Sequence, residues 1–310
     1  MTQHRTILDC DPGRDDALAI ALALASPAEV ALLGITAVAG NVPLEQTQRN
    51  ARLVAELCGR GDLPVYAGAA RPLIRELETA AHVHGEEGLA GLAVREPARP
   101  LERRHAVDLL IETLRAAGPG TITLVASGPL TNLAMAFSEA PDALAGIARI
   151  VVMGGAWEAH GNVTPTAEFN IYVDPHAAAV VFGCGRPITV IGLDVTHRVR
   201  ATAAHAEHLR AAGSPFGPLL RPHGEAAPDL PLHDPCTIAW LVAPDLFETH
   251  YVNLAVECEG AYTLGATVVD RRGRSGRAPN VDWATEVDGA AVLDLLVERL
   301  SRLATAPAAP

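Results

Sequence analysis

Four aspartates lie within eight residues near the start of the chain: Asp9, Asp11, Asp15 and Asp16. Carboxylates this close repel one another, so a fold keeps them together only if a cation lies between them or if they share protons. Hard divalent cations such as calcium bind shells of oxygen ligands of this kind. Capping of the next helix explains one or two of these aspartates, but not all four. The cluster therefore predicts a metal site.

The aspartate cluster stands between a predicted strand and a predicted helix. Residues 6–8 indicate a strand, Gly13 can relax the turn that follows, and residues 17–25 show the pattern of a helix. In open α/β sheets, ligands bind beyond the carboxyl ends of the strands. We therefore expect the metal site at the mouth of a strand–loop–helix unit.

Further polar groups follow later predicted strands. Asn41 comes after the strand predicted at 30–38, Ser127 after the strand predicted at 122–126, and Met153 ends another strand before two glycines. Because the carboxyl ends of parallel strands share one edge of the sheet, groups at these positions can point into the same crevice. A turn asparagine and a helix N-terminal cap are the simpler explanations.

Two later segments carry groups suited to binding hydroxyls or moving protons. Asn162, Glu168 and Asn170 lie in a glycine-containing loop and supply donors and acceptors for hydroxyl groups. His233 stands beside Asp234, and a histidine next to a carboxylate suits proton transfer near neutral pH. A polar loop and a helix cap at Asp234 are the alternatives.

Two conspicuous motifs do not indicate metal binding. His82 and His84 form an H-x-H pair, but no third zinc ligand stands nearby, so a zinc site is not expected. The arginines between residues 271 and 277 are interpreted as a solvated hairpin end.

Strand-like apolar runs alternate with helical patterns along most of the chain. Strands are predicted at residues 6–8, 30–38, 63–66, 122–126, 149–153 and 188–191, and helices at 17–25, 44–58, 106–117, 130–138, 175–182, 235–242 and 290–303. This alternation indicates βαβ units, and continuous Val, Ile and Leu runs are typical of a parallel sheet covered on both faces. The predicted fold class is α/β, an open, mostly parallel sheet flanked by helices.

The remaining segments complete the predicted organisation. Residues 68–100 are expected to form a long loop with one or two helical pieces, and residues 201–231 an irregular, proline-rich stretch. Residues 251–257 and 266–269 are predicted to form a small C-terminal β-hairpin with a basic tip at 271–274.

Composition limits the possible partners. The chain carries 36 acidic against 24 basic residues, a net charge of −12, which disfavours nucleic acid because phosphate binding needs a basic face. All 24 basic residues are arginine, which excludes Schiff-base lysine chemistry and the lysine of P-loop enzymes. Hydrophobic residues make up 49% and aromatic residues only 4%, so aliphatic side chains must fill the core.

Length and cysteine usage indicate the organisation and the compartment. Without an internal repeat or a clear linker, residues 1–304 are expected to form one domain, followed by a disordered tail at 305–310. Five widely spaced cysteines, none in a C-x-x-C pair, indicate reduced thiols. No apolar leader precedes the first strand and no apolar stretch is long enough to span a bilayer, so we expect a cytoplasmic protein without membrane contact.

Together these residues resemble the inosine–uridine preferring nucleoside hydrolase family. The segment from Asp9 to Ala17 is highly specific, whereas each later motif is weak alone. The later motifs occur in the matching order: Gly40-Asn41, Arg49-Asn50-Ala51, His84-Gly85, Gly128-Pro129-Leu130-Thr131-Asn132, Met153-Gly154-Gly155, Glu168-Phe169-Asn170, Leu193-Asp194-Val195-Thr196-His197, His233-Asp234-Pro235 and Thr267-Val268-Val269-Asp270. The match runs nearly end to end.

The resemblance implies a Rossmann-like fold and one calcium ion per subunit. Asp11 and Asp16 would bind calcium through their side chains, and Asp234 would be a third carboxylate ligand. Ser127 would donate its main-chain carbonyl to the ion. Asp11 would also be the general base for the attacking water.

The resemblance also implies a ribonucleoside substrate. The implied substrate-binding positions are Asp15, Asn41, His84, Met153, Asn162, Glu168, Asn170 and His233. Asp15 would accept a hydrogen bond from a ribose hydroxyl. His233 is the first candidate to protonate the leaving base, with His84 and His223 behind it.

The implied reaction is hydrolysis of the N-glycosidic bond to free base and ribose. Breaking this bond builds oxocarbenium character on the ribose, which anionic walls favour. Members of the family tend to be dimers or tetramers, so a homodimer or homotetramer is expected. Purine versus pyrimidine preference stays open.

Two other classes of protein compete with this interpretation. Haloacid dehalogenase-like phosphatases also begin with a strand and Asp-x-Asp, but this chain has Gly13 where they have threonine or valine, and it has no lysine. A non-catalytic binder of the same fold could hold a nucleoside or ribose without cleaving it. Release of free base rather than phosphate separates the hydrolase from the phosphatase, and nucleoside binding without release of ribose would indicate the binder.

Overall fold

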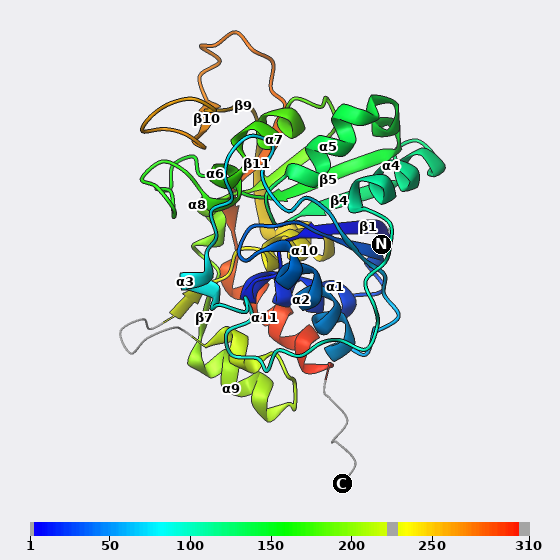
Figure 1. Cartoon of the computed structure of the whole chain (residues 1–310). Coiled ribbons are helices and arrows are strands. Elements are labelled where there is room, and N and C mark those ends of the chain that lie inside the picture. Colours follow the sequence, from blue (N-terminus) through cyan, green and yellow to red (C-terminus); the bar gives the residue numbers. More distant parts are fainter. Residues whose placement is uncertain (1–2, 222–228, 304–310) are drawn as a thin grey trace.

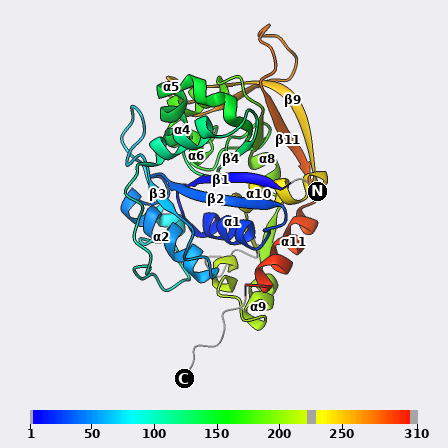
Figure 2. The same ribbon diagram turned by 90° about the vertical axis from the view of Figure 1, so that its right-hand side faces the viewer.

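A nine-stranded sheet with helices on both faces forms the centre of the molecule (Figure 1). The computed structural model describes residues 3–221 and 229–303. The order of strands is β10-β9-β11-β6-β5-β4-β1-β2-β3, and Figure 2 shows the two helical layers on either side. The predicted α/β class is confirmed.

The strands of the described residues form this sheet and one separate two-stranded ribbon, β7–β8. They are β1 (His4–Cys10), β2 (Val30–Ala37), β3 (Val65–Ala67), β4 (Ile122–Ala126), β5 (Ile147–Met153), β6 (Ile188–Ile191), β7 (Arg200–Thr202), β8 (Asp229–Pro231), β9 (Phe247–Val256), β10 (Thr267–Asp270) and β11 (Val281–Val287).

The helices alternate with the strands over most of the chain. They are α1 (Arg14–Leu24), α2 (Leu44–Leu57), α3 (Ala81–His84), α4 (Ala106–Ala116), α5 (Thr131–Glu139), α6 (Phe169–Val173), α7 (Pro175–Phe182), α8 (Leu193–Thr196), α9 (Ala203–Ala211), α10 (Pro235–Val242) and α11 (Gly289–Ser301). Short 3-10 segments occur at η1 (Pro141–Gly146), η2 (Gly217–Leu220) and η3 (Pro244–Leu246).

The strand order reverses at β1. This strand pairs in parallel with β2 on one side and with β4 on the other. The chain then continues outward to β3 beyond β2 and to β5 and β6 beyond β4. The carboxyl ends of the central strands flank a crevice at such a reversal, and this is where ligands bind in open α/β sheets.

Two aliphatic clusters fill the two faces of the sheet. One includes residues of α1, α2, α9, α10 and α11, and the other residues of α4, α5 and α7. Helix α1 is apolar nearly all round, and every residue from Asp16 to Leu24 is buried because α2, α10 and α11 contact it. Its first turn, which carries Asp15 and Asp16, therefore has a fixed place.

The prediction of an irregular stretch at 201–231 is wrong for residues 201–211 and 229–231, and residues 222–228 lie outside the described residues. Helix α9 occupies Ala203–Ala211, and β7 pairs with β8 across this segment. Ala206 and Leu209 are the buried residues of α9, so this helix packs on one side against the rest of the protein. The prolines that suggested irregular structure all follow the helix, so they mark only its end.

The C-terminal hairpin is present but belongs to the main sheet. β9 and β10 are antiparallel as predicted, whereas the basic segment 271–274 follows β10 and is not the hairpin tip. Strand β11, which the sequence analysis missed, lies between β9 and β6. Asp282 and Glu286 interrupt the apolar pattern of β11, so its sequence does not show the continuous apolar run that indicated the other strands.

Three further expectations concern the ends of the chain, one histidine and the membrane. The tail at 305–310 and His223 lie outside the described residues. None of the described helices is long and apolar enough to cross a bilayer.

Trp283 on β11 supports two glycine turns beside the crevice. Its ring is fully buried and meets Trp157 edge-on, with 6.3 Å between ring centroids. A Cβ on Gly192 would lie 2.6 Å from Cζ2 of Trp283 and 2.9 Å from the carbonyl oxygen of Gly155. Glycine at position 192 thus lets α8 approach the sheet closely.

The substitution Gly192→Ala is expected to lower the free energy of unfolding by about 1–3 kcal/mol, because Trp283 or the Gly155 turn must shift. Urea denaturation measures this value. Gly118→Ala is the control, since its Cβ would meet only the Thr121 methyl group, at 3.5 Å. Equal stability of Gly192→Ala and the unsubstituted protein would contradict the close packing.

Candidate active site

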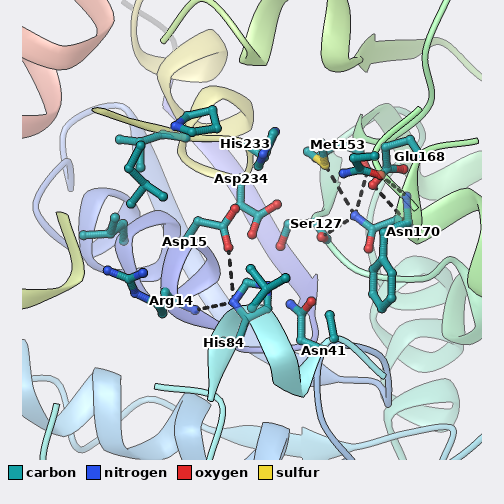
Figure 3. Close-up of a pocket in the computed structure, with 18 of the residues that line it drawn as sticks. Arg14, Asp15, Asn41, His84, Ser127, Met153, Glu168, Asn170, His233 and Asp234 are labelled. Carbon is teal, nitrogen blue, oxygen red and sulfur yellow. Dashed lines mark hydrogen bonds and ion pairs between the residues drawn. The ribbon is translucent and has the colours of Figure 1, made fainter. Parts of the chain in front are cut away.

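A cavity of about 400 Å³ opens at the carboxyl edge of the sheet (Figure 3). Its lining comes from the start of α1, from the segments after β2 and β4, and from the end of β5. Further lining residues come from α3, from α6 and the loop before it, from η2, and from β8 and the segment that leads from it to α10. The cavity therefore occupies the position that the strand order indicates.

The structure brings the predicted site residues together at this cavity. Ten of them line it: Asp15, Asn41, His84, Ser127, Met153, Asn162, Glu168, Asn170, His233 and Asp234. The other two, Asp11 and Asp16, are fully buried behind it and accept hydrogen bonds from Asn41 and Ser127.

Oriented donors hold the two buried carboxylates. The backbone N–H of Asn41 donates to Oδ2 of Asp11 at 2.6 Å, and its side-chain amide donates to Oδ2 of Asp16 at 3.1 Å. Asp16 also accepts from the backbone N–H of Gly13 at 3.0 Å and from the Ser127 hydroxyl at 2.8 Å. Asp16 thus closes the first turn of α1 onto its N-cap residue.

Two glycines let the backbone approach Asp11. A Cβ on Gly40 would collide with Oδ2 of Asp11, and a Cβ on Gly128 would lie 2.6 Å from Oδ1. The carboxylate is therefore wedged between the segments that follow β2 and β4.

Three carboxylates at the cavity form a tight group. Asp15, Asp16 and Asp234 each place an oxygen within 4.8 Å of the others. Burial, reinforced by the neighbouring carboxylates, raises the pKa of Asp11 and Asp234 well above the usual value and that of Asp16 to about 7. Burial also opposes ionisation of Asp15, but His84, His233 and hydrogen bonds, one of them with Asp234, together lower the pKa of this group. Without a cation, the cluster shares protons.

The donor set of this cluster fits a hard divalent cation. Oδ1 of Asp11 is buried and has no hydrogen-bond partner among the described residues. The group of Asp15, Asp16 and Asp234 offers only oxygen ligands, which suit calcium or magnesium better than zinc. A bound cation would favour the ionised carboxylates that burial disfavours.

Glu168 anchors the loop on the opposite side of the cavity. It is the N-cap of α6 and accepts hydrogen bonds from the backbone N–H groups of Asn170 at 2.9 Å and Ile171 at 3.3 Å. The backbone N–H of Gly155 donates to the same carboxylate at 3.0 Å. Burial raises the pKa of Glu168 to about 7, although these three bonds favour the ionised form.

Asn170 and Asn162 are held by the backbone around them. The side-chain amide of Asn170 donates to the carbonyls of Ser127 at 2.8 Å and Met153 at 3.2 Å. The side-chain oxygen of Asn162 accepts from the backbone N–H of Phe169 at 2.9 Å. The Ser127 carbonyl, predicted as a metal ligand, thus has one amide partner and retains a second lone pair.

His233 lies beside the carboxylate group. Its Nδ1 is 2.8 Å from the Thr196 hydroxyl, and its ring meets that of His197 at 5.7 Å. Burial lowers the pKa of His233 to about 4 against the opposing effect of Asp15, so the ring is neutral at neutral pH in the free protein.

His84 approaches the cluster from α3. Its Nδ1 accepts a hydrogen bond from the backbone N–H of Arg14 at 3.1 Å and lies 4.0 Å from the Asp15 carboxylate. Because Nδ1 is the acceptor, a neutral His84 carries its proton on Nε2.

Apolar side chains line part of the cavity. Its lining includes Leu18, Val83, Val163, Phe169, Leu219, Leu230 and Leu232. A flat, weakly polar ring fits against these apolar side chains, whereas a polyhydroxylated group fits against the carboxylates and amides.

Arg14 is a site residue that sequence reasoning missed. Its guanidinium is buried and donates to the carbonyls of Leu219 at 2.8 Å and Arg221 at 2.7 Å. These partners lie 205 and 207 residues away, so no local sequence pattern reveals the contact. Arg14 ties the first turn of α1 to the apolar wall of the cavity.

Comparison with known proteins identifies the relatives of this chain. The family model described as inosine-uridine preferring nucleoside hydrolase matches residues 6–294. The pyrimidine-specific ribonucleoside hydrolase RihA of Salmonella arizonae is 48% identical over 305 residues, covering 95% of this chain and 97% of RihA. The solved structure of a purine-preferring ribonucleoside hydrolase from Gardnerella vaginalis matches with a TM-score of 0.89 and 34% identity, covering 97% of this chain and 99% of that one. A plant nucleoside hydrolase structure matches with a TM-score of 0.90 and 36% identity, covering the same shares of the two chains, 97% and 99%.

Asp234→Asn is expected to stabilise the protein in excess chelator at neutral pH by about 1 kcal/mol or more, because burial and the neighbouring carboxylates raise the pKa of Asp234, so this carboxyl must take up a proton on folding and an amide of nearly the same shape need not. Thermal or urea unfolding measures the difference. The exposed Asp245→Asn serves as the control and is expected to change stability by no more than about 0.5 kcal/mol. A less stable Asp234→Asn protein in chelator would contradict the repulsion argument.

Proposed function

Because the chain belongs to the inosine-uridine preferring nucleoside hydrolase family, we propose that it hydrolyses ribonucleosides in a calcium-dependent reaction at this cavity. It is an N-glycosyl hydrolase that releases base from ribonucleosides, which removes the phosphatase alternative. The observation that supports the proposed mechanism most strongly is the convergence of Asp15, Asp16 and Asp234 within 4.8 Å.

One calcium ion per subunit is the proposed cofactor. Asp11, Asp16, Asp234 and the Ser127 carbonyl would hold it. Supporting this are the buried, unpartnered Oδ1 of Asp11 and the all-oxygen donor set. When bound, the ion supplies positive charge that engages the 2′- and 3′-hydroxyls of the ribose and lowers the pKa of an adjacent water.

The carboxylates and amides that line the cavity are proposed to bind the ribose. Asp15, Asn41, Asn162, Glu168 and Asn170 offer acceptors and donors there, and backbone hydrogen bonds fix several of them before substrate arrives. Groups that are already fixed can orient the sugar without losing conformational freedom when the substrate binds. The leaving base is proposed to lie against the apolar side chains, beside His84, Met153 and His233.

Asp11 is the proposed general base. The water oxygen bonds to C1′, the water proton passes to Asp11, and the electron pair of the C1′–N bond leaves with the base. His233 offers the proton on Nε2 to that base. Because burial lowers its pKa, His233 is a strong acid when protonated and a hydrogen-bond donor when neutral. Return of the proton from Asp11 through solvent restores both groups, so one water is consumed per nucleoside.

The wider organisation is also proposed. The continuous sheet from β3 to β10 supports one domain over residues 1–304. The five free cysteines fit a cytoplasmic protein. A homodimer or homotetramer, a small-molecule nucleoside substrate, and no nucleic acid or membrane partner complete the proposal.

A panel of purine and pyrimidine ribonucleosides, read for reducing sugar, tests the function. We expect release that chelator abolishes and calcium restores. Both base classes are needed because one relative is pyrimidine-specific and another is purine-preferring. Asp11→Ala and Asp16→Ala are expected to lose about 10²-fold or more of the rate, and Asp245→Ala none of it. Nucleoside binding by calorimetry without sugar release would instead favour the non-catalytic binder.

His233→Ala is expected to slow the cleavage of natural nucleosides by about 10²-fold or more, because their bases leave poorly without a proton. Cleavage of 4-nitrophenyl β-ribofuranoside, whose leaving group needs no proton, should change much less. Turnover numbers for both substrates give the comparison. Unchanged turnover of every nucleoside would reject His233 as the donor.

A further inference from the structure

The segment Leu193-Asp194-Val195-Thr196-His197 has no part in the function proposed so far. It forms α8 and the residue that ends it. The backbone N–H of Leu193 donates to the carbonyl of Gly155 at 2.9 Å, so the helix is attached directly to the turn after β5.

The hydroxyl of Thr196 contacts the ring of His233. Thr196 is fully buried, and its Oγ lies 2.8 Å from Nδ1 of His233. No other hydrogen-bond partner of this hydroxyl occurs among residues 3–221 and 229–303. A buried hydroxyl proton needs an acceptor, so Thr196 donates to Nδ1 when the ring is neutral.

This contact decides which nitrogen of His233 carries the proton. In the neutral ring, an Nδ1 that accepts from Thr196 leaves the proton on Nε2. In the protonated ring, Nδ1–H donates to the same hydroxyl oxygen, which turns its own proton away. Nε2 therefore bears a proton in both states.

A second neighbour limits rotation of the ring. His197, the residue after Thr196, meets the His233 ring edge-on at 5.7 Å with an interplanar angle of 67°. Two consecutive residues at the end of α8 thus contact His233. Figure 3 shows His233 beside Asp234 at the cavity.

The other end of α8 holds the loop on the sugar side. The Asp194 carboxylate accepts hydrogen bonds from three successive backbone N–H groups, those of Trp157 at 2.9 Å, Glu158 at 2.7 Å and Ala159 at 3.0 Å. This loop leads to Asn162. A single short helix therefore contacts both the candidate proton donor and the loop that carries a candidate sugar-binding residue.

We propose that Thr196 is a positioning residue that keeps a proton on Nε2 of His233 and turns that nitrogen toward the leaving base. Helix α8 then fixes the distance between His233 and the loop that leads to Asn162. This inference rests on the proposed function, in which His233 assists departure of the base. In that step the protonated ring passes its Nε2 proton to the base nitrogen as the C1′–N electron pair leaves with the base. The ring is then neutral with Nδ1–H donating to the Thr196 hydroxyl, and a proton from solvent restores it.

Kinetics with two leaving groups test the proposal. Thr196→Val removes the hydroxyl at nearly constant shape, and Thr196→Ser keeps it. Thr196→Val is expected to lower kcat for the best natural nucleoside by about 10- to 100-fold, while KM and the rate with 4-nitrophenyl β-ribofuranoside stay within about 3-fold. Thr196→Ser should restore kcat to within about 3-fold of the unsubstituted enzyme.

Thr47→Val is the matched control. Thr47 is also fully buried, and its hydroxyl donates to the carbonyl of Leu44 at 3.2 Å, away from the cavity. This variant also loses a hydrogen bond made by a buried threonine hydroxyl, so it reports the general effect of a Thr→Val substitution. Unaltered kinetics are expected for it.

Nitrogen NMR reads the tautomer directly. Two-bond ¹⁵N–¹H correlations on protein with labelled histidine should show one Nε2–H pattern for His233, assigned by its absence in His233→Ala. Thr196→Val should give a mixed or Nδ1–H pattern. An unchanged pattern, an unchanged kcat, or equal losses with both leaving groups would overturn the role of Thr196.

Failure of the underlying function has a different signature. If His233→Ala slows both substrates equally, the donor role of His233 fails, whatever Thr196→Val does. If His233→Ala slows only natural nucleosides and Thr196→Val slows neither substrate, the donor role stands and the positioning role of Thr196 fails.

Discussion

Mutual repulsion among buried carboxylates is the constraint on which this structure depends. Asp11 follows β1, Asp15 and Asp16 begin α1, and Asp234 stands at the start of α10. Helix α1 contacts α10 and is enclosed on its other sides, so these groups cannot move apart without disturbing the core. The repulsion is relieved only by protons or by a cation. Oriented donors from Asn41, Gly13 and Ser127 stabilise the charge that remains.

The cavity divides the chemical tasks between two kinds of surface. Some of the lining residues offer carboxylates and amides that backbone bonds already orient, and the others offer aliphatic and aromatic side chains. His233 stands where the two meet, next to Asp234. Buried Arg14 joins the two surfaces from the other side, because its backbone contacts His84 and its guanidinium contacts the wall at Leu219. The division matches a substrate with a hydroxylated sugar at one end and a flat ring at the other.

Sequence reasoning succeeded where the relevant residues are local. The aspartates are neighbours in the chain, and Asn41, Ser127 and Met153 directly follow or end strands, so one rule about parallel sheets placed them all. It failed where tertiary contacts decide. Strand β11 carries charges on its exposed positions and is ordered only by pairing with β9 and β6. The hydrogen bond between Thr196 and His233 joins residues 37 positions apart, and neither segment has a sequence pattern that indicates this contact.

The close packing of Asp11 against Gly40 and Gly128 limits which positions of the chain can be substituted in laboratory evolution. A side chain at either glycine would displace the carboxylate, so libraries that randomise these positions will return mostly inactive clones. The aliphatic side chains of Leu219, Leu230 and Leu232 also line the cavity, and their replacement by apolar side chains of similar volume is tolerated better. Altered substrate range is therefore to be sought at these leucines, while the two glycines stay constant.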